Sequence, residues 1–215
     1  MKDKKLIAFN MYDTWVYMTK YPNPYKIFFS QLWLQDSAGK ELSYILQTTD
    51  KNIEDILPEN IQSQKNIAFL ISELASNIHS QLSSLLLYDD FLPTIKTLKQ
   101  RWYTTAVVSN LSKPYILPIT HFIPKNTFDY HILSFKVWEI KPNKKIFHHL
   151  KDISWYASDD IVMVGDSIPS DVQWAKNADI DPIHIQRNQS LIKKNVDYIQ
   201  ISRLSELLDM FHTIK

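Results

Sequence analysis

The chain has 215 residues, of which 45% are hydrophobic and 22% charged, and its net charge is +1. This balance is typical of a globular protein and gives no electrostatic reason to expect nucleic acid or an anionic membrane as partner. The chain has no cysteine, which excludes disulfides and thiolate chemistry, and without a signal-peptide core or a membrane-length apolar run we expect a cytoplasmic protein.

The first apolar run, residues 6–9 (LIAF), leads directly into the polar stretch NMYDT at residues 10–14. A short apolar run bounded by polar residues is typical of a buried strand in a parallel sheet. In open α/β sheets, ligands bind outside the carboxyl ends of such strands, so we expect residues 10–14 to line a ligand site. The strand ends at Asn10, an amide where a catalytic nucleophile would be expected.

Residues 16–89 depart from this pattern and carry helical patterns instead. Helices inserted directly after the first strand would overhang its carboxyl end. We therefore expect a helical cap domain over residues 16–89 and an α/β core domain formed by residues 1–15 and 90–215. The longest segment has apolar residues at three- and four-residue steps, typical of a helix face that packs in a core: Ile67, Leu70, Leu74, Ile78, Leu82 and Leu85.

After the insertion, strand patterns and helical patterns alternate along the chain. This alternation predicts a three-layer α/β fold with a doubly wound parallel sheet and helices on both faces. The expected strands are residues 104–108, 130–133, 161–164 and 182–185, with a weaker run at 198–201, and the expected helices are 143–150, 171–177 and 204–211.

Three further polar motifs follow apolar runs: Ser109-Asn110, Lys141 before a proline, and Asp166 with Asp171 in GDSIPSD. Taken singly, each has a structural interpretation, as a surface lysine, a turn serine or helix-capping aspartates. Their order, each at a strand end, favours one shared site in which a lysine, a hydroxyl and two carboxylates could hold Mg²⁺. A magnesium ion beside a lysine suits phosphoryl chemistry.

With this motif order and the inserted helices, the chain resembles the haloacid dehalogenase (HAD) superfamily of hydrolases over essentially its full length, in the subgroup with a helical cap after the first strand. The segment YDDFLPTIKTLKQRWYTTAVVSN also resembles the family's passage from cap to core. The resemblance implies a Rossmann-like fold and an enzyme whose first-strand aspartate attacks the substrate. In such enzymes a covalent aspartyl intermediate forms, which water then hydrolyses.

The resemblance also implies roles for the motif residues. Asn10 occupies the position of the nucleophile. Ser109 would bind the transferring phosphoryl group, and Lys141 would neutralise it and orient the nucleophile. Thr14 and Asn110 are expected to contribute to substrate binding.

For the metal, the resemblance implies Mg²⁺ held by Asp166, the Tyr12 backbone carbonyl and Asn10, with Asp171 supporting the lysine or the metal shell. Family phosphatases usually have a second aspartate, the general acid and base, where this chain has Tyr12. A tyrosine there resembles the metal-independent dehalogenases, but those enzymes lack the first carboxylate of the fourth motif. Because this chain keeps Asp166, the pattern favours a phosphatase-type site.

The sequence therefore predicts a Mg²⁺-dependent phosphatase of a small phosphorylated metabolite, impaired because the neutral amide of Asn10 is a poor nucleophile. A 2-haloacid dehalogenase-like enzyme, favoured by Tyr12, is one alternative. A catalytically inactive phosphometabolite-binding protein is the other. The expected partner is a small phosphate ester, with neither nucleic acid nor membrane, and the expected state is a monomer or homodimer.

One feature of the composition is abnormal, since the chain has 2 glycines and 6 tryptophans, whereas average usage would give roughly 15 glycines. Trp15 fits no pattern. The other tryptophans stand where glycine or a small residue is expected. Trp33, Trp102 and Trp155 follow helical segments, where a left-handed residue is usual. Trp138 stands three residues before Lys141, where the family tends to have glycine, and Trp174 stands on a helix that is expected to pack closely on the sheet.

Overall fold

A parallel sheet of six strands forms the centre of the computed structural model, which describes residues 4–20, 23–34, 37–191 and 196–212. The strands lie in the order β5-β4-β1-β6-β7-β8, and every neighbouring pair is parallel. The predicted three-layer, doubly wound α/β fold is thereby confirmed. The strands are β1 (Leu6–Phe9), β4 (Thr104–Ser109), β5 (Tyr130–Leu133), β6 (Ile161–Gly165), β7 (Asp181–Ile185) and β8 (Ile199–Ile201).

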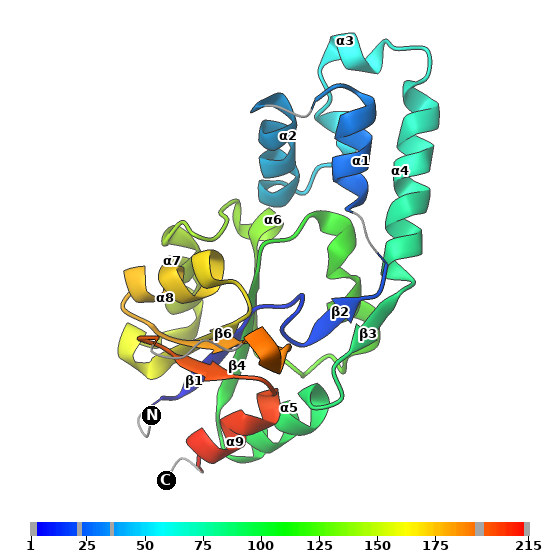
Figure 1. Cartoon of the computed structure of the whole chain (residues 1–215). Helices are drawn as coiled ribbons and strands as arrows, with labels where there is room; N and C mark the ends of the chain where they lie inside the picture. The colour runs from blue at the N-terminus through cyan, green and yellow to red at the C-terminus, as the bar shows by residue number, and fades with distance from the viewer. Residues whose placement is uncertain (1–3, 21–22, 35–36, 192–195, 213–215) are drawn as a thin grey trace.

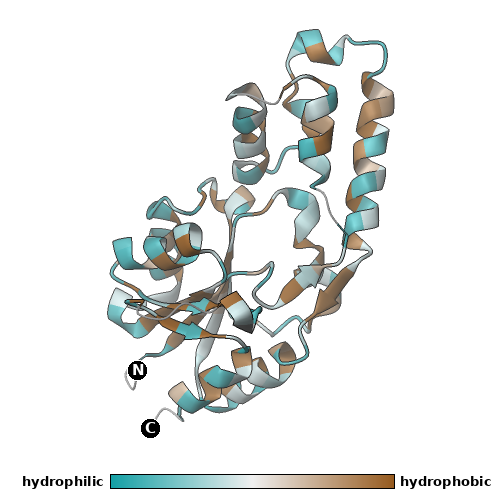
Figure 2. Ribbon diagram, viewed as in Figure 1, coloured by the Kyte–Doolittle hydropathy of each residue, from teal (hydrophilic) through white to brown (hydrophobic). Residues whose placement is uncertain are grey.

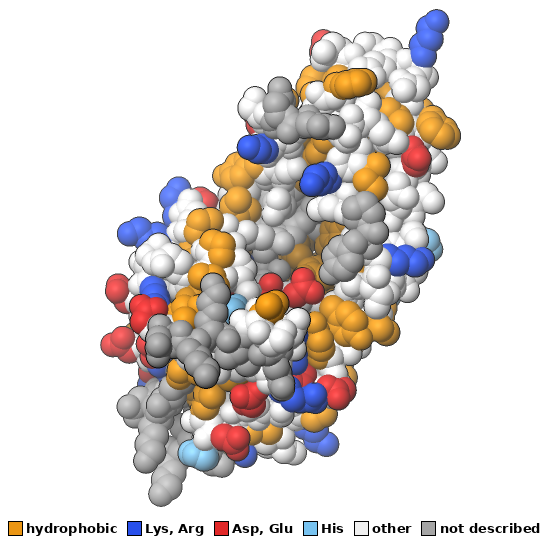
Figure 3. All heavy atoms as spheres, viewed as in Figure 1, with side chains coloured by type: hydrophobic (Ala, Val, Ile, Leu, Met, Phe, Trp, Pro, Cys, Tyr) orange, Lys and Arg blue, Asp and Glu red, His pale blue; other side chains and the backbone are white. Residues whose placement is uncertain are grey.

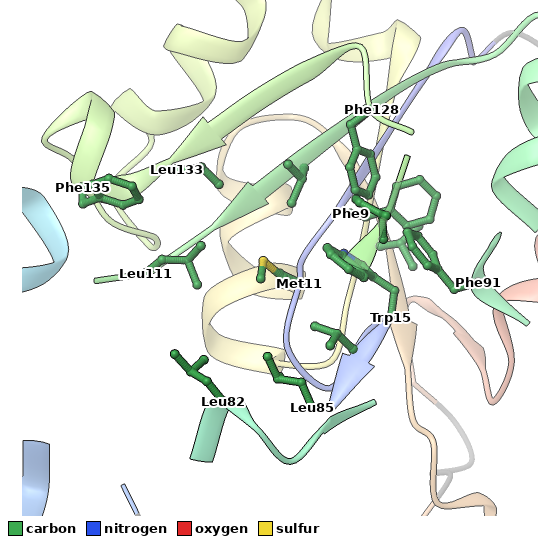
Figure 4. Packing of buried hydrophobic residues seen from close by; sticks show 14 of the residues in the cluster. Phe9, Met11, Trp15, Leu82, Leu85, Phe91, Leu111, Phe128, Leu133 and Phe135 are labelled. Atoms are coloured by element: carbon green, nitrogen blue, oxygen red, sulfur yellow. The ribbon is translucent and has the colours of Figure 1, made fainter. Parts of the chain in front are cut away.

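Helices cover both faces of the sheet. Side chains alternate between the two faces along each strand, so a strand such as β1 has apolar residues that pack against helices on either face. Ile7 and Phe9 of β1 pack with α5 and α9 on one face, whereas Leu6 and Ala8 pack with α7 and α8 on the other. Apolar residues accordingly concentrate on the strands (Figure 2), and Figure 4 shows part of the cluster around Phe9. These helices are α5 (Phe91–Gln100), α7 (Lys145–Ser154), α8 (Gln173–Asn177) and α9 (Leu207–Met210).

Four further helices, α1–α4, lie together beyond one end of the sheet, and we call them the helical unit (Figure 1). The chain enters the unit from β2 and leaves it through β3, and these two strands pair antiparallel as a separate ribbon. No helix of the described ranges is long and apolar enough to cross a membrane. The elements are β2 (Val16–Met18), α1 (Pro24–Gln31), α2 (Ser37–Thr48), α3 (Glu59–Gln62), α4 (Ile67–Leu82) and β3 (Leu85–Leu87).

The apolar stripe of α4 is one residue shorter than predicted. The helix ends at Leu82, and Leu85 lies in β3, opposite Met18 of β2. Two serines end the helix, because the Ser83 hydroxyl donates to the His79 carbonyl at 2.8 Å and the Ser84 hydroxyl to that of Gln81 at 2.7 Å. Such bonds compete with the continuing helical ladder.

Short elements complete the connections between strands and helices. The predicted helix at 171–177 is divided into a π turn followed by α8, and the one at 204–211 into a 3₁₀ turn followed by α9. These elements are α6 (Ser134–Val137), the 3₁₀ turns Ile53–Asp55, Lys113–Ile116, Ser158–Asp160, Gln189–Leu191 and Leu204–Glu206, and the π turns Pro118–Phe122 and Ile168–Val172.

A buried carboxylate, Asp90, ties three distant segments of the chain together. It accepts hydrogen bonds from the Arg187 guanidinium at 2.8 and 3.1 Å and from the backbone N–H of Leu204 at 2.6 Å. Arg187 in turn donates to the Thr14 carbonyl and stacks over the ring of Tyr88, with 3.8 Å to its centroid. The segment that leads from the helical unit back to the sheet is thus joined to the segment after β7 and to the C-terminal helices.

Replacing Asp90 by alanine should therefore reduce the free energy of unfolding by about 3–5 kcal/mol, because the largely buried Arg187 charge would lose its carboxylate partner. Urea unfolding measures this change. The neighbouring Asp89→Ala is the matched control: Asp89 is exposed and paired with Arg203, so its removal should change stability very little. Equal effects of the two variants would contradict the anchoring role of Asp90.

Candidate active site

Three adjacent strands bring the first, second and fourth polar motifs together. Asn10 follows β1, Ser109 ends β4 and Asp166 follows β6, and β1 lies between the other two strands. Parallel strands end at the same edge, so these side chains meet. The Ser109 hydroxyl donates to Oδ1 of Asn10 at 3.2 Å, and Nδ2 of Asn10 donates to Oδ1 of Asp166 at 2.8 Å.

Lys141 completes this group from the third motif. Its ammonium is buried and donates to Oδ1 of Asn10 at 2.8 Å, to the Val108 carbonyl at 3.1 Å and to Oδ1 of Asp171 at 2.6 Å. The side chains of Lys141 and Asp171 are only 2% and 1% exposed, so Lys141 is not a surface lysine. The hydroxyl of Ser109 and the ammonium of Lys141 converge on the same oxygen of Asn10.

Asp171 holds the lysine through a closely fitted turn. One of its carboxylate oxygens accepts from Lys141, and the other accepts from the backbone N–H of Ser167 at 3.0 Å. A Cβ atom on Gly165 would overlap this carboxyl group, which explains a glycine at the end of β6. The helix-capping interpretation applies instead to Ser167, whose hydroxyl oxygen accepts from the Ser170 N–H at 3.2 Å.

Asn110 positions the backbone of Lys141. Its amide Nδ2 donates to the Lys141 carbonyl at 2.9 Å, and its Oδ1 accepts from the Lys141 N–H at 2.8 Å. This pair of bonds imitates the pairing of a neighbouring strand. Both polar atoms of the side chain are therefore engaged within the protein, a role that the sequence prediction of substrate binding did not include.

The other side of Asn10 faces two oxygen atoms. Nδ2 of Asn10 donates to the Tyr12 carbonyl at 3.2 Å as well as to Asp166, which also accepts from the Thr14 hydroxyl at 3.2 Å. Burial, followed by the nearby charge of Asp171, raises the pKa of Asp166. A carboxylate and a carbonyl oxygen that converge on one donor form the kind of oxygen set that Mg²⁺ prefers.

The donor set fits magnesium, but it is sparse in charged ligands. Within the described residues, no group of three or more His, Cys, Asp or Glu side chains is placed to hold a metal ion. Of the expected ligands, Asp166 and the Tyr12 carbonyl lie together beside Asn10. The carboxylate of Asp171 points to Lys141 and Ser167 instead.

The side chain of Tyr12 points away from this group. Its hydroxyl donates to the Tyr115 carbonyl at 3.0 Å, and the two rings pack edge to face with centroids 5.9 Å apart. Burial raises the pKa of Tyr12 well above its usual value. The phenol stays protonated, and its proton is used in a structural hydrogen bond.

A cavity of about 1090 Å³ lies between the helical unit and the carboxyl ends of the strands. It reaches the polar group through Tyr12 and Asn110, whereas most of its wall comes from α1 and α2. The space-filling view shows a hollow between the helical unit and the sheet, with acidic side chains beside it (Figure 3). The motif analysis missed the cavity residues because no motif marks them: Tyr25, Lys26, Lys40, Tyr44 and Tyr115.

The chain belongs to the haloacid dehalogenase-like hydrolase family, whose model matches residues 16–185. No curated protein sequence matches the chain. Among solved structures, it is similar to a HAD phosphatase from Thermococcus onnurineus, with a TM-score of 0.65 and 22% identity over 98% of this chain and 100% of that one.

Two other similar structures are a magnesium-bound hydrolase and a dehalogenase. The HAD hydrolase YfnB from Bacillus subtilis, bound to magnesium, has a TM-score of 0.63 at 16% identity, covering 98% of this chain and 99% of that one. A 2-haloacid dehalogenase from Pseudomonas syringae pv. tomato has a TM-score of 0.63 at 16% identity, covering 96% and 97%. At these identities the likeness shows the fold alone.

Replacing Lys141 by methionine should lower the free energy of unfolding by about 3–5 kcal/mol, because Asp171 would be left buried and unpaired. The double variant Lys141→Met/Asp171→Asn should recover part of this loss. Lys145→Met is the surface control, since Lys145 is exposed and pairs with Glu139 on the surface, and its cost should be about 0–1 kcal/mol. Urea unfolding compares the three variants, and equal losses for the two lysines would refute the buried pair.

Proposed function

We propose that this hydrolase-family chain has a phosphatase-type site for a small phosphate ester and Mg²⁺, and that Asn10 impairs its turnover. The observation that carries the proposal is the convergence of Lys141 and Ser109 on Oδ1 of Asn10, at 2.8 and 3.2 Å. A buried cation and a hydroxyl aimed at one point are suited to a transferring phosphoryl group, whose charge must be neutralised and whose position must be fixed.

Asp166 and the Tyr12 carbonyl would hold Mg²⁺. The amide oxygen of Asn10 accepts from Lys141 and Ser109 instead, and it would reach the ion only after a rotation of the amide. When bound, the ion would supply charge neutralisation and a template for the phosphoryl oxygens. Asn10 weakens this arrangement, because its NH₂ group already satisfies the oxygens of Tyr12 and Asp166. An aspartate at this position could only accept hydrogen bonds, so two carboxylates would face each other until a cation came between them.

The same amide explains impaired turnover. A neutral amide is a poor nucleophile, so attack on phosphorus would need the carboxylate that this chain lacks. The phenol of Tyr12 is held by the Tyr115 carbonyl, with its pKa raised by burial. It is therefore unsuited to replace the usual general acid and base. Lys141 and Ser109 would still bind and orient the ester.

The helical unit would act as the cap, with its cavity holding the part of the substrate beyond the phosphoryl group. The tyrosines and two lysines of the wall favour an ester whose remaining part has both an apolar surface and negative charge. The second candidate is a 2-haloacid dehalogenase, favoured by Tyr12 and disfavoured by the retained Asp166. The third is a phosphometabolite-binding protein without turnover.

The metal site can be tested by thermal unfolding. Without divalent ions, Asn10→Asp should melt below the parent, because the introduced carboxylate and that of Asp166 would repel each other. At Mg²⁺ a hundredfold above its Kd, this variant should gain about 2.7 kcal/mol, a Tm rise of roughly 5–10 °C, and the parent clearly less. Adding Asp166→Asn should remove the gain, and potassium chloride at equal ionic strength is the salt control. Equal Mg²⁺ shifts in parent and variant would contradict the assignment.

Turnover is tested with a panel of phosphate esters and Mg²⁺. A nucleophile can contribute up to about 10⁶ in kcat, and a missing general acid removes about 10²–10⁴ of this, so Asn10→Asp should raise kcat by about 10²–10⁴. The introduced carboxylate acts on the chemical step rather than on substrate binding, so KM should change far less than kcat. Activity on a 2-haloacid in the presence of EDTA would select the dehalogenase. A folded, Mg²⁺-binding Asn10→Asp variant that binds esters without hydrolysing any would select the binding protein.

A further inference from the structure

Four tryptophans have a backbone conformation that favours glycine. Trp33, Trp102, Trp138 and Trp155 have φ angles of 59°, 71°, 59° and 61°. Neither of the two glycines has a positive φ. A left-handed backbone brings Cβ too close to the following carbonyl oxygen, and for a bulky residue it is an outlier. Chance placement would not concentrate this conformation in the bulkiest residue type.

The hydrogen bonds at these sites define helix endings that glycine normally provides. After α1, the Trp33 N–H donates to the Ser30 carbonyl at 3.1 Å and the Leu34 N–H to that of Phe29 at 2.8 Å. This pair of bonds is the Schellman motif, whose left-handed residue is usually glycine. Similar bonds follow α5 and α7: Trp102 N–H to Lys99 O at 3.0 Å, Tyr103 N–H to Leu98 O at 3.1 Å, and Trp155 N–H to Lys151 O at 2.8 Å.

The side chains of these four strained residues are not packed in the protein interior. Trp33, Trp102, Trp138 and Trp155 are 90%, 77%, 72% and 92% exposed. A tryptophan that stabilises a fold buries its ring, because the large apolar surface is its main contribution. At these positions the ring lies in solvent and the backbone is the part of the residue that the fold uses.

Trp174, unlike these four exposed tryptophans, is buried, and its ring is too large for the space that holds it. It lies on α8 with no exposed surface, and its ring centroid is only 3.1 Å from that of Phe147, at an interplanar angle of 18°. Aromatic pairs normally keep their centroids about 4.5–7 Å apart. The indole N–H still donates to the Asn143 carbonyl at 3.0 Å, but the two rings are closer than stacked aromatic rings allow, so the site suits a smaller residue.

Trp15 differs from the other five. Its φ is not positive, and it is fully buried, stacked on Phe91 with centroids 4.5 Å apart and tilted against Phe128 at 5.6 Å (Figure 4). These are ordinary aromatic distances. The ring of Trp15 therefore packs as a tryptophan ring normally does, although its buried Nε1 has no hydrogen-bond partner within the described residues.

We propose that the native protein carries glycine in place of Trp33, Trp102, Trp138, Trp155 and Trp174. In this proposal the gene has UGA at these five codons, and the source organism reads UGA as glycine, whereas the present sequence reads it as tryptophan. Trp15 is then encoded by UGG. One reassigned codon would raise the glycines from 2 to 7 and lower the tryptophans from 6 to 1, and it accounts for both kinds of misfit.

The stability test compares glycine and alanine substitutions in the chain as written. Trp33→Gly, Trp102→Gly and Trp155→Gly should each raise Tm by about 2–4 °C, because the left-handed strain is removed. The sites are well separated, so the increases should add. Trp→Ala at the same positions keeps the Cβ and should give much less of the gain. Trp15→Gly is the opposite control and should lower Tm strongly, because it opens a cavity.

The gene and the native protein decide the proposal. We expect UGA codons at the five sites and UGG at Trp15, with mass spectrometry of tryptic peptides from the source organism showing glycine at the five sites. UGG codons at Trp33, Trp102, Trp138 and Trp155 would overturn the proposal whatever the melting temperatures. It would also be overturned if the glycine variants melted no higher than the alanine variants.

Discussion

The rest of the site depends on the hydrogen bonds of the buried Lys141 ammonium. A charge excluded from water needs partners on every side, and this one has the Asp171 carboxylate, the Val108 carbonyl and the Asn10 amide oxygen. These partners come from the ends of β1 and β4 and from the turn after β6. The lysine thus fixes the relative positions of the strand ends, and Asn110 fixes the lysine backbone in turn.

The amide of Asn10 completes this hydrogen-bond network without a metal ion. One end of the amide accepts from Lys141 and Ser109, and the other donates to the Tyr12 carbonyl and Asp166. A carboxylate has acceptors at both ends and would need a cation on the second side. With asparagine at position 10 the hydrogen bonds of the site are complete within the protein, whereas an aspartate there would need a cation to separate it from Asp166.

The sheet and the polar group could be predicted because their signals are local and ordered. The apolar run at residues 6–9 became β1 with the predicted limits, and Lys141 points to Asn10 as the motif order implied. Other features depend on distant geometry. Leu85 fits a helical stripe and a strand equally well by spacing, and only its pairing with Met18 decides between them. The double bond of Asn110 to Lys141 and the cavity wall at Tyr25 and Lys40 follow from tertiary contacts that no spacing encodes.

The ribbon of β2 and β3 has a mechanical consequence. Both connections to the helical unit pass through these two strands, which are paired from Val16–Leu87 to Met18–Leu85. Bending one strand would bend its partner, so a tilt of the unit about this stem would move its helices together. Such a rocking movement would widen or narrow the cavity at α1 and α2 while the ion pair of Lys141 and Asp171 stayed in place. A tilt of this kind would therefore change the cavity without changing the charged group at the strand ends.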